Sequence, residues 1–246
     1  MSNYEGLSKI YDFMMSGVDY EGWADYILAA ARRFGSEPRT VLDLACGTGS
    51  TTLPLAKRGL SATGLDLAPA MLEIARKKAA DAGLDVDFVE MNMLEMNFSA
   101  PFDMIVSFQD GINYLTGEGD FDRLAAAVEK NLCENGLFLF DLNRVDHYSD
   151  SDTTVVELDD MYLVYENEYR AAERIWRIRL TGFLREGELY RKFEEIHEEK
   201  NHDFDEVRAA LRRHHMEIAA VWKMFYEEDA ADETNRVLVI ARKGKN

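Results

Sequence analysis

The stretch that decides the fold is VLDLACGTG at residues 41–49. A short apolar run ends in a turn with two glycines, and a helix-like segment follows from Thr51. This is the pattern of a buried parallel strand that leads into the N-terminus of a helix. Gly47 and Gly49 let the backbone bend sharply, and the free N–H groups of such a turn can bind a ligand. The sequence therefore predicts a ligand site where this strand ends.

A second signal lies about 20 residues further along the chain. Residues 61–66 (SATGLD) read as another short strand with Asp66 at its carboxyl end. In a doubly wound sheet this position faces the ribose of a bound nucleoside, where a carboxylate can accept hydrogen bonds from both hydroxyl groups. The alternative is an ordinary strand, turn and helix with a solvated aspartate. The coincidence of two signals at this spacing favours the nucleoside site.

Two features argue against a nicotinamide dinucleotide as the ligand. The fingerprint G-x-G-x-x-G is incomplete, because Thr52 occupies the position of the third glycine. Asp43 lies just before the turn, where its negative charge suits a cationic ligand group better than a pyrophosphate.

Residues 41–49 resemble the first motif of class I S-adenosylmethionine-dependent methyltransferases, and residues 65–75 (LDLAPAMLEIA) resemble the next motif of that family. The resemblance implies that Asp43 reaches the methionine end of the cofactor and that Asp66 binds its ribose. Asn92 stands where the family usually has an acid that bonds the adenine amino group. An amide oxygen can still accept that hydrogen bond.

The resemblance is most specific across residues 39–115 and implies S-adenosylmethionine as the cofactor. In related methyltransferases of small molecules a tyrosine from the N-terminal helices approaches the cofactor, and Tyr11 is the candidate here. The loop at residues 109–115 should border the transferring methyl group, because ligands bind at the carboxyl ends of such strands. Its Asp110 and Asn113 also fit ordinary turn chemistry.

The candidate cofactor-binding residues are Tyr11, Asp43, Ala45, Gly47, Thr48, Gly49, Asp66, Leu67, Met71, Asn92, Met93 and Phe108. The candidate substrate contacts are Asp110, Asn113 and Tyr114. No catalytic residue is assigned, because methyl transfer of this kind depends more on alignment than on proton chemistry.

The remaining chain alternates helices and strands, as α/β proteins do. Helices are predicted over residues 20–35, 68–82, 119–132 and 203–213, and further strands over residues 86–90, 102–108, 136–141, 216–225 and 237–242. The predicted fold class is therefore α/β, with a doubly wound, mostly parallel, seven-stranded sheet of the Rossmann-like methyltransferase type.

Residues 143–200 have a different pattern. Four segments alternate apolar and polar residues, which predicts an inserted antiparallel sheet. We expect a cofactor-binding core at residues 1–142 and 201–246, with an N-terminal helical lid, and a β cap at residues 143–200. The family resemblance implies that such an insert covers the substrate cleft or mediates a homodimer.

Composition limits the partners. The chain has 246 residues, of which 47% are hydrophobic, enough for one α/β domain with a full core. Its net charge of −18 repels nucleic acids and anionic membranes. Neither the two cysteines nor His214 and His215 have metal-ligand spacing, so no metal site is expected. The N-terminus lacks a signal-peptide pattern and no apolar run could span a membrane, so we expect a cytoplasmic protein.

The sequence thus predicts an S-adenosylmethionine-dependent methyltransferase that acts on N or O of a small-molecule acceptor. The acidic composition favours an amine or another neutral-to-cationic acceptor. Two alternatives remain open: a non-catalytic protein that binds a nucleoside cofactor, and, less favoured, a nicotinamide-dependent oxidoreductase.

Overall fold

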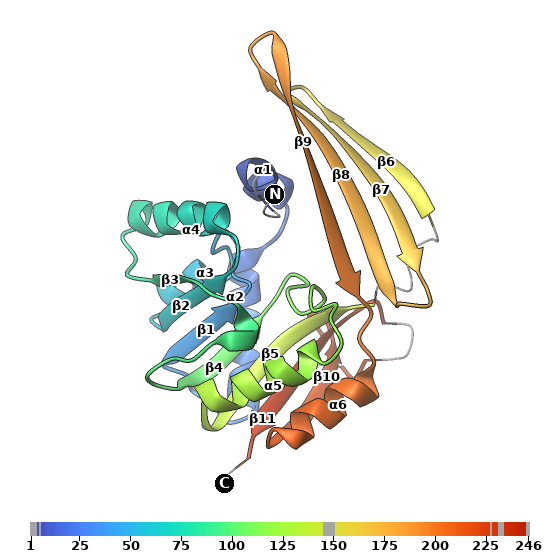
Figure 1. Ribbon diagram of the computed structural model, residues 1–246. Helices are drawn as coiled ribbons and strands as arrows, with labels where there is room; N and C mark the ends of the chain where they lie inside the picture. Colours follow the sequence, from blue (N-terminus) through green and yellow to red (C-terminus); the bar gives the residue numbers. More distant parts are fainter. Residues whose placement is uncertain (1–3, 5, 145–150, 227, 231–233, 245–246) are drawn as a thin grey trace.

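The computed structural model describes residue 4 and residues 6–144, 151–226, 228–230 and 234–244. Its larger sheet consists of β1 (Thr40–Leu44), β2 (Ser61–Asp66), β3 (Asp87–Glu90), β4 (Phe102–Ser107), β5 (Leu132–Asn143), β10 (Met216–Lys223) and β11 (Arg236–Lys243). The strand order is β3-β2-β1-β4-β5-β11-β10 (Figure 1). β11 runs antiparallel to both β5 and β10, whereas the pairs among β1 to β5 are parallel. The predicted fold class is confirmed.

The helices predicted at residues 20–35, 68–82, 119–132 and 203–213 occur within two residues of those bounds, as α2 (Tyr20–Arg33), α4 (Pro69–Asp81), α5 (Asp120–Asn131) and α6 (Phe204–Arg213). The structure also has α1 (Ser8–Met14) in the predicted N-terminal lid and α3 (Thr52–Lys57) after the glycine turn. The 3-10 helix η1 (Met93–Glu95) was not predicted. The clearest difference is β5, which starts at Leu132, directly after α5, and not at residue 136.

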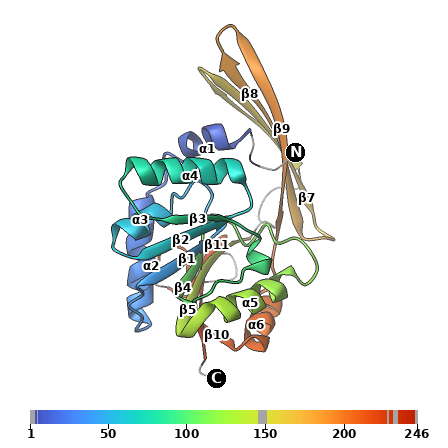
Figure 2. The same ribbon diagram turned by 60° about the vertical axis from the view of Figure 1, so that its left-hand side comes forward.

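Alternation along the central strands sends successive side chains to opposite faces of the sheet. In β5, Leu137 and Leu139 pack with Ile27 and its neighbours on α2, whereas Phe138 and Phe140 pack with α5 and α6. Figure 2 shows α2 and α5 on opposite sides of the sheet. Both faces are therefore covered, which explains why β1, β4 and β5 read as near-continuous apolar runs.

A separate antiparallel sheet follows β5. It consists of β6 (Ser151–Leu158), β7 (Met161–Arg170), β8 (Ile175–Glu186) and β9 (Leu189–Lys200), in that order. Both views show it projecting from the core, with α1 between it and α4 (Figures 1 and 2). The antiparallel insert was predicted, although its residues 145–150 lie outside the described ones, as do residues 1–3 and 5 of the lid. The division into core and cap, and dimerisation through this sheet, stay predictions.

Asn113 joins the cap to the core. Its side chain is fully buried, and its Nδ2 donates to the carbonyl oxygens of Asn143 at 2.8 Å and Lys200 at 2.9 Å. Its Oδ1 accepts from the N–H of Asn143 at 3.0 Å. Asn143 ends β5 and Lys200 ends β9. One amide therefore holds the two points where the chain leaves the core and returns to it.

We expect Asn113→Ala to destabilise the protein by about 2–4 kcal/mol, because it leaves several buried backbone groups without partners at about 1–3 kcal/mol each, not fully additive. Urea unfolding followed by circular dichroism measures this. Asn97→Ala, at an exposed position, is the control and should change stability by less than about 0.5 kcal/mol. A similarly small effect at Asn113 would show that the amide does not hold the junction.

Candidate functional site

The backbone turns sharply where β1 and β4 end. Ala45 and Gly47 follow β1 with φ of 52° and 55°, and Gln109 and Asp110 follow β4 with φ of 63° and 64°. Residues other than glycine seldom adopt this left-handed conformation, and such residues cluster at binding and active sites. Gly111 then passes close to β1, since an added Cβ would lie 2.8 Å from the Cβ of Ala45. The turns after β1 and β4 therefore pack closely against each other at the carboxyl edge of the sheet.

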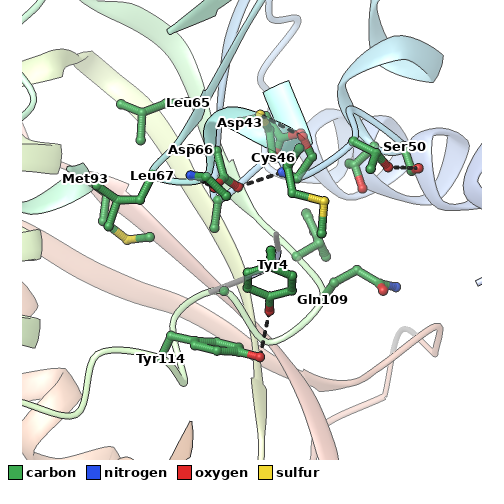
Figure 3. A pocket seen from close by; sticks show the side chains of 18 of the residues that line it. Tyr4, Asp43, Cys46, Ser50, Leu65, Asp66, Leu67, Met93, Gln109 and Tyr114 are labelled. Carbon is green, nitrogen blue, oxygen red and sulfur yellow. Dashed lines mark hydrogen bonds between the residues drawn. The ribbon is translucent and has the colours of Figure 1, made fainter. Parts of the chain in front are cut away.

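A cavity of about 360 Å³ lies above this edge. Its size is in the range of small-molecule sites. The charged residues among its described lining are Asp43 and Asp66, both acidic (Figure 3). The candidate residues that line it are Tyr11, Asp43, Ala45, Gly47, Thr48, Asp66, Leu67, Met71, Met93, Phe108 and Tyr114. The structure therefore brings together residues from the carboxyl ends of β1 and β2, from the loops after β1, β2 and β4, from α4 and η1, and from the N-terminal segment.

Four candidates do not line the cavity. Gly49 packs on α4 and β3, because a Cβ there would lie 3.2 Å from Ala75 and 3.1 Å from Phe88. The Oδ1 of Asn92 accepts from the N–H of Leu94 at 2.9 Å and caps η1. Asn113 holds the cap junction, and Asp110 faces a cluster described below. Their contacts are with the protein, and a ligand role for them stays a prediction.

Asp66 connects the two turns that follow β1 and β2. Its Oδ2 accepts from the N–H of Gly47 and its Oδ1 from the N–H of Ala68, both at 2.8 Å (Figure 3). Burial raises the pKa of this carboxyl, while the hydrogen bonds from Ala68, Gly47 and Leu67 oppose the rise. A carboxylate oxygen accepts more than one hydrogen bond. Asp66 can therefore hold the turn and still accept from a ligand hydroxyl.

Thr52 explains the departure from the glycine fingerprint. Its hydroxyl donates to Oδ2 of Asp43 at 2.5 Å, and both side chains are buried. The pKa of Asp43 is raised to about 7. Burial is the main cause and the charge of Asp66 adds to it, while the hydrogen bond from Thr52 opposes the rise. A glycine at position 52 would leave this buried carboxyl without its hydroxyl donor.

The N-terminal segment, which comprises Tyr4 and residues 6–20, covers the cavity. Tyr4, Tyr11 and Tyr20 all line it. Asp12 anchors the segment to the glycine turn, since its Oδ1 accepts from the hydroxyl of Thr48 at 2.6 Å and its Oδ2 lies 2.9 Å from Nζ of Lys78. Only Tyr11 was predicted to line the cavity. Tyr4 and Tyr20 could not be predicted, because their local sequence does not show that they face it.

Polar side chains from three parts of the chain meet beside Tyr114. The hydroxyl of Tyr4 donates to that of Tyr114 at 2.7 Å (Figure 3), and the Tyr114 hydroxyl lies 3.1 Å from Nδ1 of His197 on β9. His197 was not predicted from the sequence. Its only signal is its place in a strand of alternating pattern, and that pattern does not say which face is buried.

A cluster of three carboxyls and one guanidinium lies next to Tyr114. Asp110 pairs with Arg236, whose Nη1 lies 3.5 Å from Oδ2 of Asp141. Glu199 on β9 is 5% exposed, and among the described residues its Oε2 has no hydrogen-bond partner. Burial, together with the charge of Asp110, raises the pKa of Asp141 to about 7 and that of Glu199 to about 8, against the lowering effect of Arg236. When all three carboxyls are ionised, their negative charge exceeds the single positive charge of Arg236.

In the described part of the chain, no three His, Cys, Asp or Glu side chains are arranged as ligands for a metal ion. No helix described there is both long and apolar enough to cross a bilayer.

Comparisons with known proteins agree with this geometry. Residues 41–136 match the family model of the methyltransferase domain. "Putative methyltransferase YqeM" of Bacillus subtilis (strain 168) is 28% identical over 98% of each chain. The crystal structure of an S-adenosylmethionine-dependent methyltransferase from Clostridium acetobutylicum ATCC 824 is 26% identical, covers 98% of this chain and 99% of its own, and superposes with a TM-score of 0.88.

The chain is a class I S-adenosylmethionine-dependent methyltransferase. Its cofactor is S-adenosylmethionine, a nucleoside with a sulfonium and an ammonium group. The two acidic residues in the cavity wall fit these cationic groups. The sugar N-methyltransferase KedS8 from Streptoalloteichus sp ATCC 53650 shares the fold, with 20% identity, a TM-score of 0.80 and coverage of 100% of this chain and 97% of its own.

The methyltransferase should become less stable, relative to a Glu199→Gln variant, as pH rises. The raised pKa means that folded Glu199 holds its proton between about pH 4.5, where the unfolded chain loses it, and about pH 8. In this window the native state binds more protons, so its stability falls with increasing pH. Urea unfolding without ligand should show Glu199→Gln and wild type alike near pH 4.5, and the variant more stable by on the order of 1–4 kcal/mol at pH 8.5. A constant difference across this range would contradict the shift.

Asp66→Ala should weaken binding of S-adenosylmethionine on the order of 100-fold, because hydrogen bonds to a charged group contribute roughly 1.5–3 kcal/mol each. Part of this loss comes from the Gly47 turn, which loses its acceptor. Isothermal titration calorimetry measures the affinity. Asp66→Asn should lose less, since an amide oxygen still accepts one bond. Wild-type affinity in a folded Asp66→Ala protein would remove Asp66 from the cofactor site.

Proposed function

We propose that this methyltransferase transfers the methyl group of S-adenosylmethionine to the nitrogen of a small amine. The observation that carries the proposal is the cluster of Asp110, Asp141 and Glu199 with Arg236 beside Tyr114, in which the carboxyls of Asp141 and Glu199 are buried. An excess of buried carboxylates favours a cation nearby. The likeness in fold to KedS8, which is named as a sugar N-methyltransferase, is compatible with an amine.

The cofactor residues are assigned by their place in the cavity. Asp66 accepts from the ribose hydroxyls, and Asp43 faces the cationic methionine end. The apolar side chains of Leu67 and Met93 lie near Asp66 in the cavity wall (Figure 3), and Met71 lines the same cavity, so that an adenine ring can pack there. Bound S-adenosylmethionine supplies an electrophilic methyl group, so the protein's task is to hold cofactor and acceptor in line.

The charge of the cluster reaches the cavity although its carboxyls lie outside the lining. Tyr114 lines the cavity, and after burial the charge of Glu199 is the next cause that raises its pKa. Asp110 also contributes to the raised pKa of Tyr11, after burial and the charge of Tyr20. The tyrosines therefore experience a negative potential once Asp141 and Glu199 ionise, at a pH above the raised pKa values of about 7 and about 8.

This potential distinguishes nitrogen from oxygen acceptors. When a neutral amine attacks the methyl group, positive charge develops on its nitrogen, and fixed negative charge stabilises that transition state. An alcohol or phenol reacts best as its anion, which the same potential disfavours.

The test is transfer of label from methyl-labelled S-adenosylmethionine to matched pairs: 2-phenylethylamine with 2-phenylethanol, and aminodeoxyhexoses with the parent hexoses. We expect label in the amines. At about pH 8.5, where Glu199 is ionised, Glu199→Gln should reduce kcat/KM for the amine about 10- to 100-fold, since one such electrostatic contribution is typically worth a few kcal/mol. Calorimetry should give cofactor affinity within about twofold of wild type. Label only in the hydroxyl members would contradict an amine acceptor.

A further inference from the structure

The inner face of β9 is polar and buried. Glu195, His197 and Glu199 alternate along it and are all less than 9% exposed, whereas Glu194 and Ile196 point outward and are exposed. Burial of charged groups is unfavourable unless partners compensate it. Glu195 and His197 contact each other, and their other partners come from outside the cap.

Glu195 binds three backbone N–H groups of the N-terminal segment. Its Oε1 accepts from Gly6 at 2.8 Å and from Leu7 at 3.0 Å, and its Oε2 accepts from Tyr4 at 3.0 Å. Burial opposes its ionisation, but His197 and these amides hold the pKa of Glu195 below its ordinary value. The carboxylate thus receives charge-assisted hydrogen bonds from a segment almost 190 positions away in the sequence.

Tyr4 is held at both ends. Its N–H reaches Glu195 directly, and its hydroxyl reaches Glu195 through Tyr114 and His197, whose Nε2 lies 3.3 Å from the Oε2 of Glu195. Tyr4 has a φ of 72°, a conformation that bulky residues rarely adopt and that requires such fixation. These contacts form a closed ring of four residues.

Packing joins the same surfaces. A Cβ on Gly6 would lie 2.5 Å from the ring of Phe193 on β9, so the segment passes directly over this strand. Leu7 and Ile10 form one apolar cluster with Leu163 and Leu180 of the cap.

We propose that Glu195 is a positioning residue of the cofactor site, which holds the N-terminal segment from the cap so that Tyr4 and Tyr11 close the cavity over S-adenosylmethionine. Both tyrosines line the cavity, while Glu195 does not. Glu195 therefore acts through the segment and not through the ligand. The proposal rests on the cofactor site of the proposed function and is independent of the acceptor.

The test compares Glu195→Gln with Glu194→Gln, whose exposed carboxylate on the outer face of the same strand contacts Lys192. Glutamine loses the charge and turns an N–H₂ group toward backbone donors. Hydrogen exchange without ligand should become at least about tenfold faster at Gly6, Leu7 and Ser8, and remain unchanged in β7 and β8. S-adenosylhomocysteine should bind about tenfold more weakly, mostly through faster dissociation.

Gly6→Ala provides a second route, since it separates the segment from Phe193 without altering Glu195 and should have the same two effects. Wild-type exchange and affinity in Glu195→Gln would overturn the proposal. So would faster exchange throughout β7 and β8, which indicates a structural role, or an equal effect of Glu194→Gln. If wild type failed to bind S-adenosylhomocysteine, the cofactor site itself would be wrong, while the exchange data would still report whether Glu195 holds the segment.

Discussion

The constraint on which the site depends is that β1, β2 and β4 end at the same edge of a parallel sheet. The segment that follows each of these strands must turn away from that edge so that it does not fill the ligand site. β1 does so through Ala45 and Gly47, and β4 through Gln109 and Asp110, all in the left-handed conformation. The carboxylate of Asp66 then bonds the Gly47 turn to the turn after β2. The ends of the strands therefore form the wall of the cavity at the sheet edge, and this wall does not need a ligand to take its shape.

The buried polar face of β9 links the cap to the core and to the N-terminal segment. A strand that buries Glu195, His197 and Glu199 on one face can be accommodated only where other elements supply donors. The N-terminal segment and Tyr114 supply them for the first two residues. This reciprocal dependence explains why two parts of the chain so distant in sequence lie together.

Much of the architecture could be predicted because it is encoded locally. The apolar runs, the glycine turn and the acid that ends β2 are each visible within about ten residues, and their spacing identifies the fold. The alternating pattern of residues 143–200 likewise revealed an antiparallel sheet. Family resemblance added what each motif should bind.

The remainder depends on contacts between distant residues. Asn113 reads as a turn residue or a substrate contact, but its partners are Asn143 and Lys200. In β9 an apolar residue, Ile196, marks the wrong face as buried, because the buried face is the charged one. Glu195 could not be selected from a run of acidic residues when its partners lie at the other end of the chain. Periodicity identifies a strand, but the choice of buried face requires knowledge of what packs against it.

The acidic groups that shape the site also oppose its folding. Asp43 and Asp66 line one cavity, burial disfavours the charge on both, and the charge of Asp66 further disfavours ionisation of Asp43. A hydrophobic wall would be more stable, but it would bind a neutral nucleoside as well as a charged one. A sulfonium or ammonium group in the cavity reverses the sign of the electrostatic interaction, so the carboxyls that are unfavourable without ligand become favourable with it. Binding of a cation therefore offsets part of the stability that these buried carboxyls cost the protein without ligand.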